Sequence, residues 1–598
     1  MDRSRFSPEY LKMTNPLFFA EAQRARSVDS LRERLSELVS RIEFDSFHDY
    51  TRFDEGSIER VRDCATAMRS ILRKRSDDLT GFSVAKAIRD ISRNRPRPDL
   101  SPGFYAELLH IILGIQGRGP GRTIIDLHLN SSHLSGREAA RERSAQLDLL
   151  WKDVERRFAR YSSGLEPSAK KRRAARRDGI LEILGGSRTD WEDWRWHVRN
   201  VVKDVDLLGR LVTLSEAEKE AVAAARRRRL PFGITPYYLS LMDNDDPGVR
   251  DASIRAQVIP SLEYVEKMSE MRGRDSSCLD FMREEDTSPC ELITRRYPAI
   301  CILKPFNTCP QICVYCQRNW EINDAMAKGA YAGERKIDAA LRWIEEHPAV
   351  HEVLVTGGDP LAMTDDVLGR ILKKISRIES IERIRIGSRT PVTIPMRITE
   401  ALVDLLASLR KPGRREIVLV THIQHSSEIT EDVVHAVARL RDRGIAVYNQ
   451  LVFTFYASRR FEAAFLRRNL RLAGIDPYYT FNTKGKEETA AYRVPIARLL
   501  QEQKEEARLL PGMERTDEAV FNIPGLGKNY IRARQHREIL SVLPDGSRIY
   551  EFHPWEKNIS NSRPASYIFQ DIPIIEYLER LETVVEDPGD YETIWYYF

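Results

Sequence analysis

Residues 300–316 read ICILKPFNTCPQICVYC. The apolar run Ile300–Leu303 is typical of a buried strand, and three cysteines follow it closely: Cys309, Cys313 and Cys316. Seven cysteines in the whole chain are too few for a disulfide framework. Because ordinary packing does not require three of them within eight positions, the segment predicts a strand that ends in a metal-binding loop.

From about residue 300 onward, short apolar runs alternate with amphipathic helical stripes. The candidate strands are Ile300–Leu303, Val353–Val355, Ile384–Ile386, Ile417–Val420, Ala446–Phe453 and Tyr478–Phe481. The helical stripes are Ile337/Leu341/Ile344, Val367/Ile371/Ile375, Leu402/Leu405/Leu409 and Val433/Val437/Leu440. Apolar strands that alternate with helices indicate an α/β fold with a parallel sheet covered by helices. Six such units predict a partial (β/α)6 barrel of the TIM type, with its functional groups where strands pass into the following loops.

The rest of the chain divides into three further parts. Residues 1–180 form a charged helical extension, with Leu31, Leu35, Leu38 and Ile42 at helical spacing and no catalytic motif. Residues 181–290 are a second helical part, residues 291–500 hold the barrel, and residues 501–598 form a small α+β segment. The extension predicts packing or oligomerisation rather than catalysis.

Composition excludes several classes of protein. The chain has 598 residues, of which 42% are hydrophobic and 31% charged, with a formal net charge of +5. This near-neutral balance argues against a nucleic-acid-binding protein. No apolar run approaches the roughly 18–20 residues of a membrane span, and the start lacks the apolar stretch of a signal peptide. We therefore expect a cytoplasmic protein without nucleic-acid or membrane partners.

Two basic runs stand out, Lys170–Arg173 with Arg176 and Arg177, and Arg226–Arg229. Each could contact phosphate groups. Aromatic residues are not interleaved with the charges, so solvated helix faces or a linker are the preferred interpretation.

The spacing of the cysteine triplet is C-x3-C-x2-C, with Tyr315 before the last cysteine. Structural zinc usually takes four ligands in two pairs, and the chain has no second pair. Three thiolates suit a four-iron cluster that leaves one iron open. The pattern resembles the motif of radical S-adenosylmethionine enzymes. That resemblance implies that the free iron binds S-adenosylmethionine, and that one electron from an external flavodoxin- or ferredoxin-type donor releases a 5′-deoxyadenosyl radical.

Beyond the superfamily, the chain resembles the lysine 2,3-aminomutase (KamA-like) family from about Trp191 to about Pro554. The matching segments are Asp193–Trp196, Ile234–Ser240, Glu285–Thr287, Arg296–Pro298, Arg385–Pro391, Thr421–His422, Glu428–Thr430, Asn449–Gln450, Pro477–Tyr479 and Asn529–Tyr530. The resemblance implies an isomerase that moves an α-amino group to the β carbon. It also implies three cofactors: a [4Fe-4S] cluster, S-adenosylmethionine and pyridoxal 5′-phosphate.

The resemblance assigns roles to individual residues. Those implied for the cofactors are Cys309, Cys313 and Cys316 for the cluster; Gly357, Gly358, Asp359, Ser388 and His422 for S-adenosylmethionine and its surroundings; and Lys528, Arg296, Tyr297 and Gln450 for pyridoxal phosphate. Lys528 follows a glycine-containing turn and is the expected covalent attachment point. Arg318 is expected to hold the substrate α-carboxylate. Where the family has a second phosphate-binding arginine, this chain has Ile300.

The substrate prediction depends on two positions. Enzymes that act on lysine grip its distal ammonium with two aspartates, and the aligned positions here are Lys484 and Asn522. One cation and one neutral amide favour a substrate that ends in a carboxylate. The same pair is characteristic of the glutamate 2,3-aminomutase branch, so L-glutamate is the predicted substrate and β-glutamate the product.

Three alternatives stay open at this point: a lysine 2,3-aminomutase, a radical aminomutase that acts on another amino acid, and a non-catalytic iron–sulfur regulator that kept the fold. We also expect a homo-oligomer. Because no cysteine follows Cys316, a cysteine-bound zinc at an interface formed by the C-terminal part is not predicted.

Overall fold

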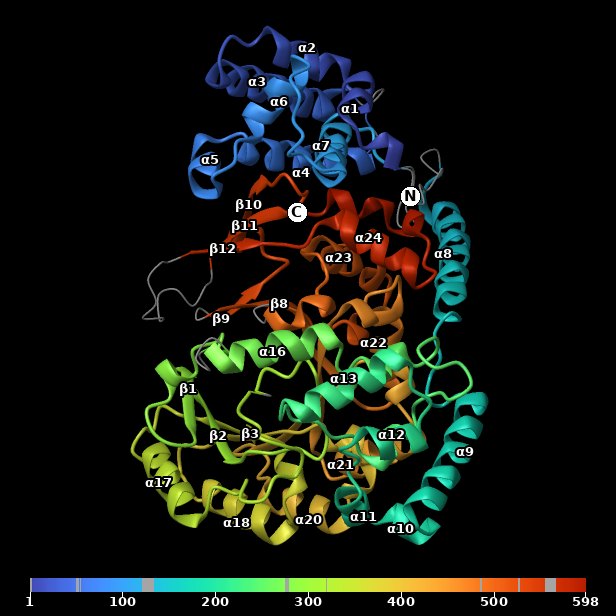
Figure 1. Cartoon of the computed structure of the whole chain (residues 1–598), viewed down its shortest axis with the longest axis vertical. Helices are drawn as coiled ribbons and strands as arrows, with labels where there is room; N and C mark the ends of the chain where they lie inside the picture. Colours follow the sequence, from blue (N-terminus) through green and yellow to red (C-terminus); the bar gives the residue numbers. More distant parts are fainter. Residues whose placement is uncertain are drawn as a thin grey trace.

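The computed structural model of the 598-residue chain describes residues 3–49, 53, 55–120, 134–274, 279–318, 320–483, 487–524, 527–553 and 566–598. Figure 1 shows two regions stacked along the long axis. The barrel strands and their helices lie at one end, and the N-terminal helices lie at the other beside the last strands of the chain. No helix within these ranges has both the length and the apolar character to cross a membrane.

A nine-stranded sheet in the order β1 to β9 forms the barrel. Its strands are β1 (Ile293–Tyr297), β2 (Ile300–Phe306), β3 (Glu352–Gly357), β4 (Arg383–Gly387), β5 (Glu416–Thr421), β6 (Ala446–Phe453), β7 (Asp476–Asn482), β8 (Glu518–Ile523) and β9 (Gly527–Tyr530). Strands β2 to β8 run parallel, whereas β1 and β9 pair antiparallel at the two edges. The six predicted strands correspond to β2 through β7, and the predicted α/β barrel fold is confirmed.

Amphipathic helices cover the outside of the parallel strands. They are α17 (Glu334–Glu345), α18 (Asp365–Ile375), α20 (Glu400–Leu409), α21 (Glu431–Asp442) and α22 (Glu462–Leu472). The predicted stripe of α17 is buried at Ile337, Leu341 and Ile344, because these residues share one helix face. Several short helices precede or flank the barrel: α10 (Arg188–Glu192), α11 (Trp194–Arg199), α12 (Val205–Leu211), α13 (Glu216–Arg227), α14 (Pro236–Leu239), α15 (Ala252–Arg255), α16 (Leu262–Arg274), α19 (Thr390–Thr393) and α23 (Ile496–Gln501).

The N-terminal region is helical, as predicted. Its helices are α1 (Pro8–Thr14), α2 (Pro16–Arg24), α3 (Val28–His48), α4 (Glu55–Ile71), α5 (Lys74–Thr80), α6 (Val84–Ser92), α7 (Pro102–Ile115), α8 (Gly136–Phe158) and α9 (Pro167–Leu184). Helices α1 to α7 gather at one end of the molecule, whereas α8 and α9 run along its side toward the barrel (Figure 1). The predicted stripe Leu31/Leu35/Leu38/Ile42 is the buried face of α3.

The N-terminal helices pack on a small C-terminal α+β unit. This unit contains the antiparallel strands β10 (Arg537–Val542), β11 (Arg548–Phe552) and β12 (Tyr567–Gln570), followed by α24 (Ile574–Thr583). A buried ion pair joins the two regions: Arg548 Nε lies 3.0 Å from both carboxylate oxygens of Glu107 on α7. The same guanidinium donates to the backbone carbonyls of Trp595 (2.7 Å) and Tyr597 (2.5 Å) near the chain end.

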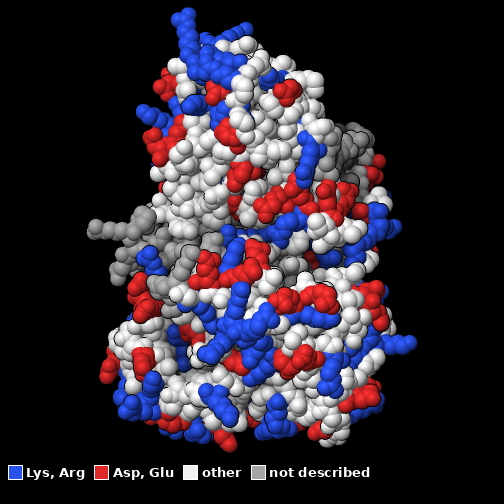
Figure 2. Space-filling view, in the orientation of Figure 1, with Lys and Arg blue, Asp and Glu red and all other residues white. Residues whose placement is uncertain are grey.

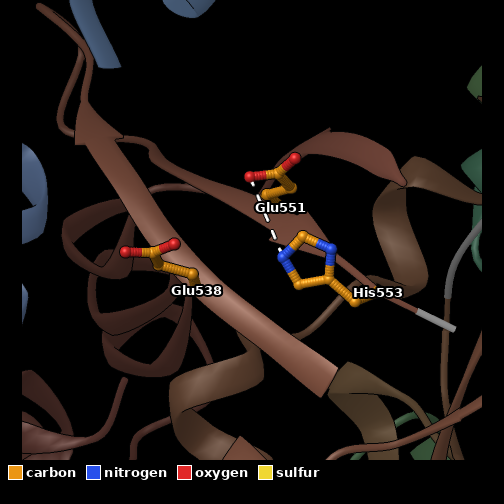
Figure 3. Close-up of side chains that lie close together, drawn as sticks. All are labelled: Glu538, Glu551 and His553. Carbon is orange, nitrogen blue, oxygen red and sulfur yellow. Dashed lines mark ion pairs between the residues drawn. The ribbon is translucent and has the colours of Figure 1, made fainter. Parts of the chain in front are cut away.

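Glu538 on β10, Glu551 on β11 and His553 directly after β11 form a cluster of metal-ligand type (Figure 3). Arg73 contacts the carboxylate of Glu538 at 2.6 Å, and Arg75 contacts that of Glu551 at 2.7 Å. Burial raises the pKa of Glu551, but Arg75 outweighs this effect and lowers it overall. Because two guanidiniums from the N-terminal helices already neutralise the two carboxylates, the cluster is an ion-pair seam between the regions rather than a metal site.

Removing the Glu107 carboxylate tests how strongly the two regions are coupled. We expect Glu107→Gln to reduce the free energy of unfolding by about 3 kcal/mol, because it leaves the buried Arg548 charge without its anion. Urea denaturation followed by circular dichroism measures the change. The control is Glu291→Gln, which breaks an exposed pair with Lys336 and should cost less than about 1 kcal/mol. Equal losses in the two variants would contradict the assignment.

Candidate functional site

A cavity of about 380 Å³ opens where the parallel strands end. Its wall takes Thr356 and Gly357 from β3, Gly387 from β4, Thr421 from β5, Phe481 from β7 and Asn522 from β8. The predicted site residues on this wall are Cys309, Cys313, Cys316, Arg318, Gly357, Gly358, Asp359, Ser388, His422, Gln450 and Asn522. The carboxyl ends of parallel strands meet at one edge of a sheet, so residues far apart in sequence converge here.

The cysteine loop follows β2 directly and is held through its backbone. The N–H of Ile312 donates to the Gly233 carbonyl (3.0 Å), and the N–H of Val314 donates to the Gln257 carbonyl (2.9 Å). The Cys309 carbonyl accepts from the N–H of Met326 (3.1 Å). Burial raises the pKa of the Cys309 thiol. The loop therefore presents three half-buried thiols to the cavity from a rigid frame.

Arg389 is a site residue that sequence analysis did not single out. Its Nη1 donates to Cys313 Sγ (2.8 Å), and its Nη2 donates to Glu428 (2.8 Å) and to the Tyr238 hydroxyl (3.0 Å). Burial lowers the pKa of Arg389, but Cys313, Tyr238 and Glu428 outweigh it and raise the pKa well above its ordinary value. A permanent positive charge therefore lies against the second cysteine of the triplet.

Glu428 is fully buried beside Arg389. Burial alone would raise the pKa of this carboxyl, but the Arg389 charge and the backbone hydrogen bonds from Gln424 and His425 outweigh it and lower the pKa. Its Oε2 also accepts from the backbone N–H groups of Gln424 (2.6 Å) and His425 (2.9 Å). The carboxylate is thus charged, and both of its oxygens accept hydrogen bonds from the protein.

The glycine pair at the end of β3 is required by the packing of the strand against the cysteine loop, which the sequence motif alone did not reveal. A Cβ on Gly358 would lie 2.1 Å from the Thr308 carbonyl oxygen, in the residue that precedes Cys309. Gly357 has φ +108°, which disfavours a side chain. The two glycines therefore let β3 approach the cysteine loop, in addition to leaving backbone open toward the cavity.

The Asp359 carboxylate joins the loops after β3 and β4. It accepts from the Ser388 hydroxyl (2.6 Å), from the N–H groups of Arg389 and Thr390 (3.0 Å each) and from the N–H of Leu361 (3.0 Å). Burial raises the pKa of Asp359, although these hydrogen bonds oppose the shift. Asp359 and Ser388 line the cavity, but their side chains are hydrogen-bonded to each other.

His422 lies on the cavity wall with both ring nitrogens in use. Nδ1 donates to the Gln450 carbonyl (2.5 Å), so Nε2 accepts from the Tyr315 hydroxyl (2.8 Å). Burial, reinforced by the Arg389 charge, lowers the pKa of His422 to about 4. The ring is therefore neutral at physiological pH and connects Gln450 on β6 to the cysteine loop.

Arg318 enters a four-residue charge cluster at the cavity. Its Nη1 lies 2.6 Å from Glu284 Oε2 and 3.4 Å from Glu321 Oε1. Lys304 Nζ lies 3.7 Å and 3.8 Å from the same two carboxylates. Because the guanidinium already has protein anions beside it, a substrate carboxylate would have to compete with Glu284 for Arg318.

Lys528 lies on β9 directly opposite Asn522 on β8. Opposed residues of an antiparallel pair point to the same face, so the half-buried Lys528 faces the side of the sheet from which Asn522 lines the cavity. Its Nζ lies 4.6 Å from the ring centroid of Tyr479 and 5.5 Å from that of Tyr297. Since Tyr297 belongs to β1, the two edges of the sheet come together at this lysine.

Two other predicted site residues, Arg296 and Lys484, are not among the described residues of the cavity wall. Arg296 lies on β1 and donates to the Met282 carbonyl, and it is not part of the cavity wall. Lys484 lies outside the described residues, between Thr483 and Thr489, which both line the cavity.

Residues 303–456 match the radical SAM superfamily. Over 597 residues the chain is 40% identical to an uncharacterized KamA family protein of Methanocaldococcus jannaschii, covering 96% of this chain and 95% of the relative. The chain belongs to the KamA family.

Two named KamA-type enzymes are similar over shorter stretches. Glutamate 2,3-aminomutase of Clostridioides difficile is 32% identical, covering 59% of this chain and 79% of the relative. L-lysine 2,3-aminomutase of Clostridium subterminale is 36% identical, covering 44% and 60%. The predicted family is confirmed, and the chain is a radical SAM aminomutase, an isomerase.

KamA aminomutases use a [4Fe-4S] cluster, S-adenosylmethionine and pyridoxal phosphate. The cavity fits a [4Fe-4S] cluster by the chemistry of its ligands, because three thiols line it and the Arg389 guanidinium donates a hydrogen bond to one of them. Lys528, which lies near two aromatic rings and opposite Asn522, is an amine in a position that fits pyridoxal phosphate.

Arg389 allows a test of the charge beside the triplet. We expect Arg389→Gln to make the reduction potential of a cluster bound there more negative by about 100 mV, because a hydrogen bond from a charged group to the sulfur is lost. Potentiometric titration followed by electron paramagnetic resonance measures the shift. Arg389→Lys retains the positive charge and should keep most of the original potential. Equal potentials in the Gln and Lys variants would show that the charge is irrelevant.

Proposed function

We propose that this KamA protein is a pyridoxal phosphate-dependent glutamate 2,3-aminomutase, which converts L-glutamate into β-glutamate. The observation that carries the proposal is the polarity of the cavity wall. Arg318, Arg385 and Arg389 line it, and Asp359, with its oxygens already hydrogen-bonded, is the one carboxylate among the described lining residues. Such a wall favours a dianionic substrate over a cationic one.

Each of these arginines has a protein counter-ion, and that of Arg385 is Glu352. Glu284 pairs with Arg318 and Glu428 pairs with Arg389, yet neither glutamate lines the cavity. In each pair, the arginine lines the space that a substrate would occupy and the glutamate does not. Asn522 adds a neutral amide where an ammonium-binding enzyme would need an acid.

The proposal gives each group of residues a task. Cys309, Cys313 and Cys316 hold the iron–sulfur cluster, and the backbone at Gly357 and Gly358 faces the amino end of S-adenosylmethionine. Arg318 holds the α-carboxylate of glutamate after Glu284 gives way, and Lys484 with Asn522 holds the distal carboxylate. Buried walls exclude water from the radical.

Lys528 is the proposed attachment point of pyridoxal phosphate, with Tyr297 and Tyr479 beside the ring and Gln450 and Arg296 at the phosphate. When bound, this cofactor supplies a π system that spreads the unpaired electron during amino migration. Ile300 contributes no charge at the phosphate, so Arg296 must leave the Met282 carbonyl to serve there.

Lys528→Ala tests the attachment point. We expect the variant to lose covalent retention of pyridoxal phosphate after borohydride reduction and to lose amino migration, because the amine paired with Asn522 across β8 and β9 is that of Lys528. Mass spectrometry of the reduced protein measures the first effect. Lys336→Ala, at an exposed lysine on α17, should retain the label. A labelled Lys528→Ala protein would disprove the assignment.

The substrate is tested with the reconstituted, chemically reduced enzyme and a panel of amino acids. We expect β-glutamate as the main product, and we expect Lys484→Asp combined with Asn522→Asp to lower kcat/KM for glutamate at least about 100-fold by reversing the local charge. Lys373→Asp, at an exposed lysine near the end of α18, is the control and should have a much smaller effect. β-Lysine as the main product of the unmodified enzyme would overturn the glutamate assignment.

A further inference from the structure

The basic run Arg226–Arg229, which the catalytic proposal does not use, lies at the C-terminal end of α13. Its last three arginines are exposed, and the helix C-terminus favours positive charge. The buried face of the same helix contributes Ala224 and Ala225 to the core.

A shared apolar cluster connects this basic end with the cysteine loop. Ala224, Ala225 and Leu230 belong to the same buried cluster as Val314, which lies between the second and third cysteines of the triplet. The chain then continues to Gly233, whose carbonyl accepts from the N–H of Ile312 in the loop. The basic end of α13 is therefore close to the cysteines through both side-chain packing and backbone hydrogen bonding.

Asp324 makes a second connection. Its carboxylate lies 2.9 Å from Arg226 and 3.5 Å from Lys203. Its backbone carbonyl accepts from the hydroxyl of Thr308 (2.8 Å), the residue before Cys309. A single residue thus links two cations of the surface to the start of the cysteine loop.

Lys203, Arg226–Arg229 and Lys328 form what we name the α13 basic surface. Arg227 is 63% exposed and contacts Glu220, and Lys328 is exposed two residues after Met326, whose N–H binds the Cys309 carbonyl. Figure 2 shows a concentration of blue Lys and Arg atoms over the part of this face where α13 and α16 lie in Figure 1. Such a surface attracts a partner of opposite charge.

We infer that the α13 basic surface is the docking site for an acidic one-electron donor protein, an inference that rests on the proposed radical function. The donor loses one electron and the iron–sulfur cluster held by the triplet gains it. Transfer through protein slows steeply with distance, so a docking surface must be closely connected to the cysteine loop, as this one is through Asp324 and Gly233. A nucleic acid is a weaker candidate, because no aromatic residue for base stacking is interleaved with the charges of Arg226–Arg229.

A binding experiment tests the docking site without reference to turnover. The probe is a purified oxidised flavodoxin, and the reconstituted enzyme is immobilised for interferometry at several salt concentrations. We expect Arg227→Glu/Arg228→Glu to raise Kd about 10-fold at low salt, and Arg227→Gln/Arg228→Gln to raise it less, since close charge pairs set both affinity and its salt dependence. The matched control is Lys373→Glu/Arg377→Glu, exposed residues at the end of α18 and in the turn after it, which should leave Kd unchanged.

A kinetic experiment separates docking from the radical chemistry itself. The measured quantity is the rate of cluster reduction by reduced flavodoxin divided by the rate with dithionite, for each variant. We expect this ratio to fall about 10-fold in the charge-reversed α13 variant and to stay constant in the α18 control. An unchanged ratio, an equal fall in both variants, or tighter binding of a single-stranded RNA than of flavodoxin would overturn the inference. Failure of dithionite to reduce any cluster in the unmodified enzyme would instead refute the proposed function.

Discussion

The ion pair between Arg389 and Glu428 is the interaction on which the site depends. It joins the loop after β4 to the loop after β5, and the same guanidinium reaches the second cysteine of the triplet. Removing two charges from water costs several kcal/mol per ion unless their remaining hydrogen bonds are satisfied. Here backbone N–H groups, a tyrosine hydroxyl and a thiol supply most of the partners, and Arg389 Nε is the buried donor of the pair that lacks one within the described residues. The pair therefore connects the two loops at a desolvation cost that these contacts offset.

The same principle operates at the other end of the molecule. Glu107 and Arg548 lie 441 positions apart in the chain, yet they form a buried pair between the N-terminal helices and the C-terminal sheet. The long alignment with the M. jannaschii protein leaves out only 4% of this chain, so it includes most of these helices. The aminomutase relatives align over 59% or less. Most of the N-terminal region therefore has a counterpart in the M. jannaschii protein.

Local patterns predicted those elements whose periodicity is strong. Continuous apolar runs identified β2 to β7, and the stripe Leu31/Leu35/Leu38/Ile42 identified α3, because burial selects the same residue types that the pattern detects. Strand β9 was not predicted, since Gly527–Tyr530 has no apolar periodicity and is defined by its pairing with β8. Gly358 was selected for ligand approach, whereas the structure adds a close backbone contact with Thr308. No sequence pattern reports such a contact.

Residue type and spacing alone establish the chemistry available to this protein: three closely spaced thiols, a glycine pair, a lysine after a turn, and the alternation that builds a barrel. These features are local, because each depends on residue type and spacing along the chain. Which charged groups come into contact depends on the folded chain. In the fold, Arg389 donates to Cys313 and Glu284 pairs with Arg318. The end of α13 that carries the basic run shares an apolar cluster with the cysteine loop. Coulombic and hydrogen-bond energies depend on separation in space and on burial, and neither quantity is present in the order of residues.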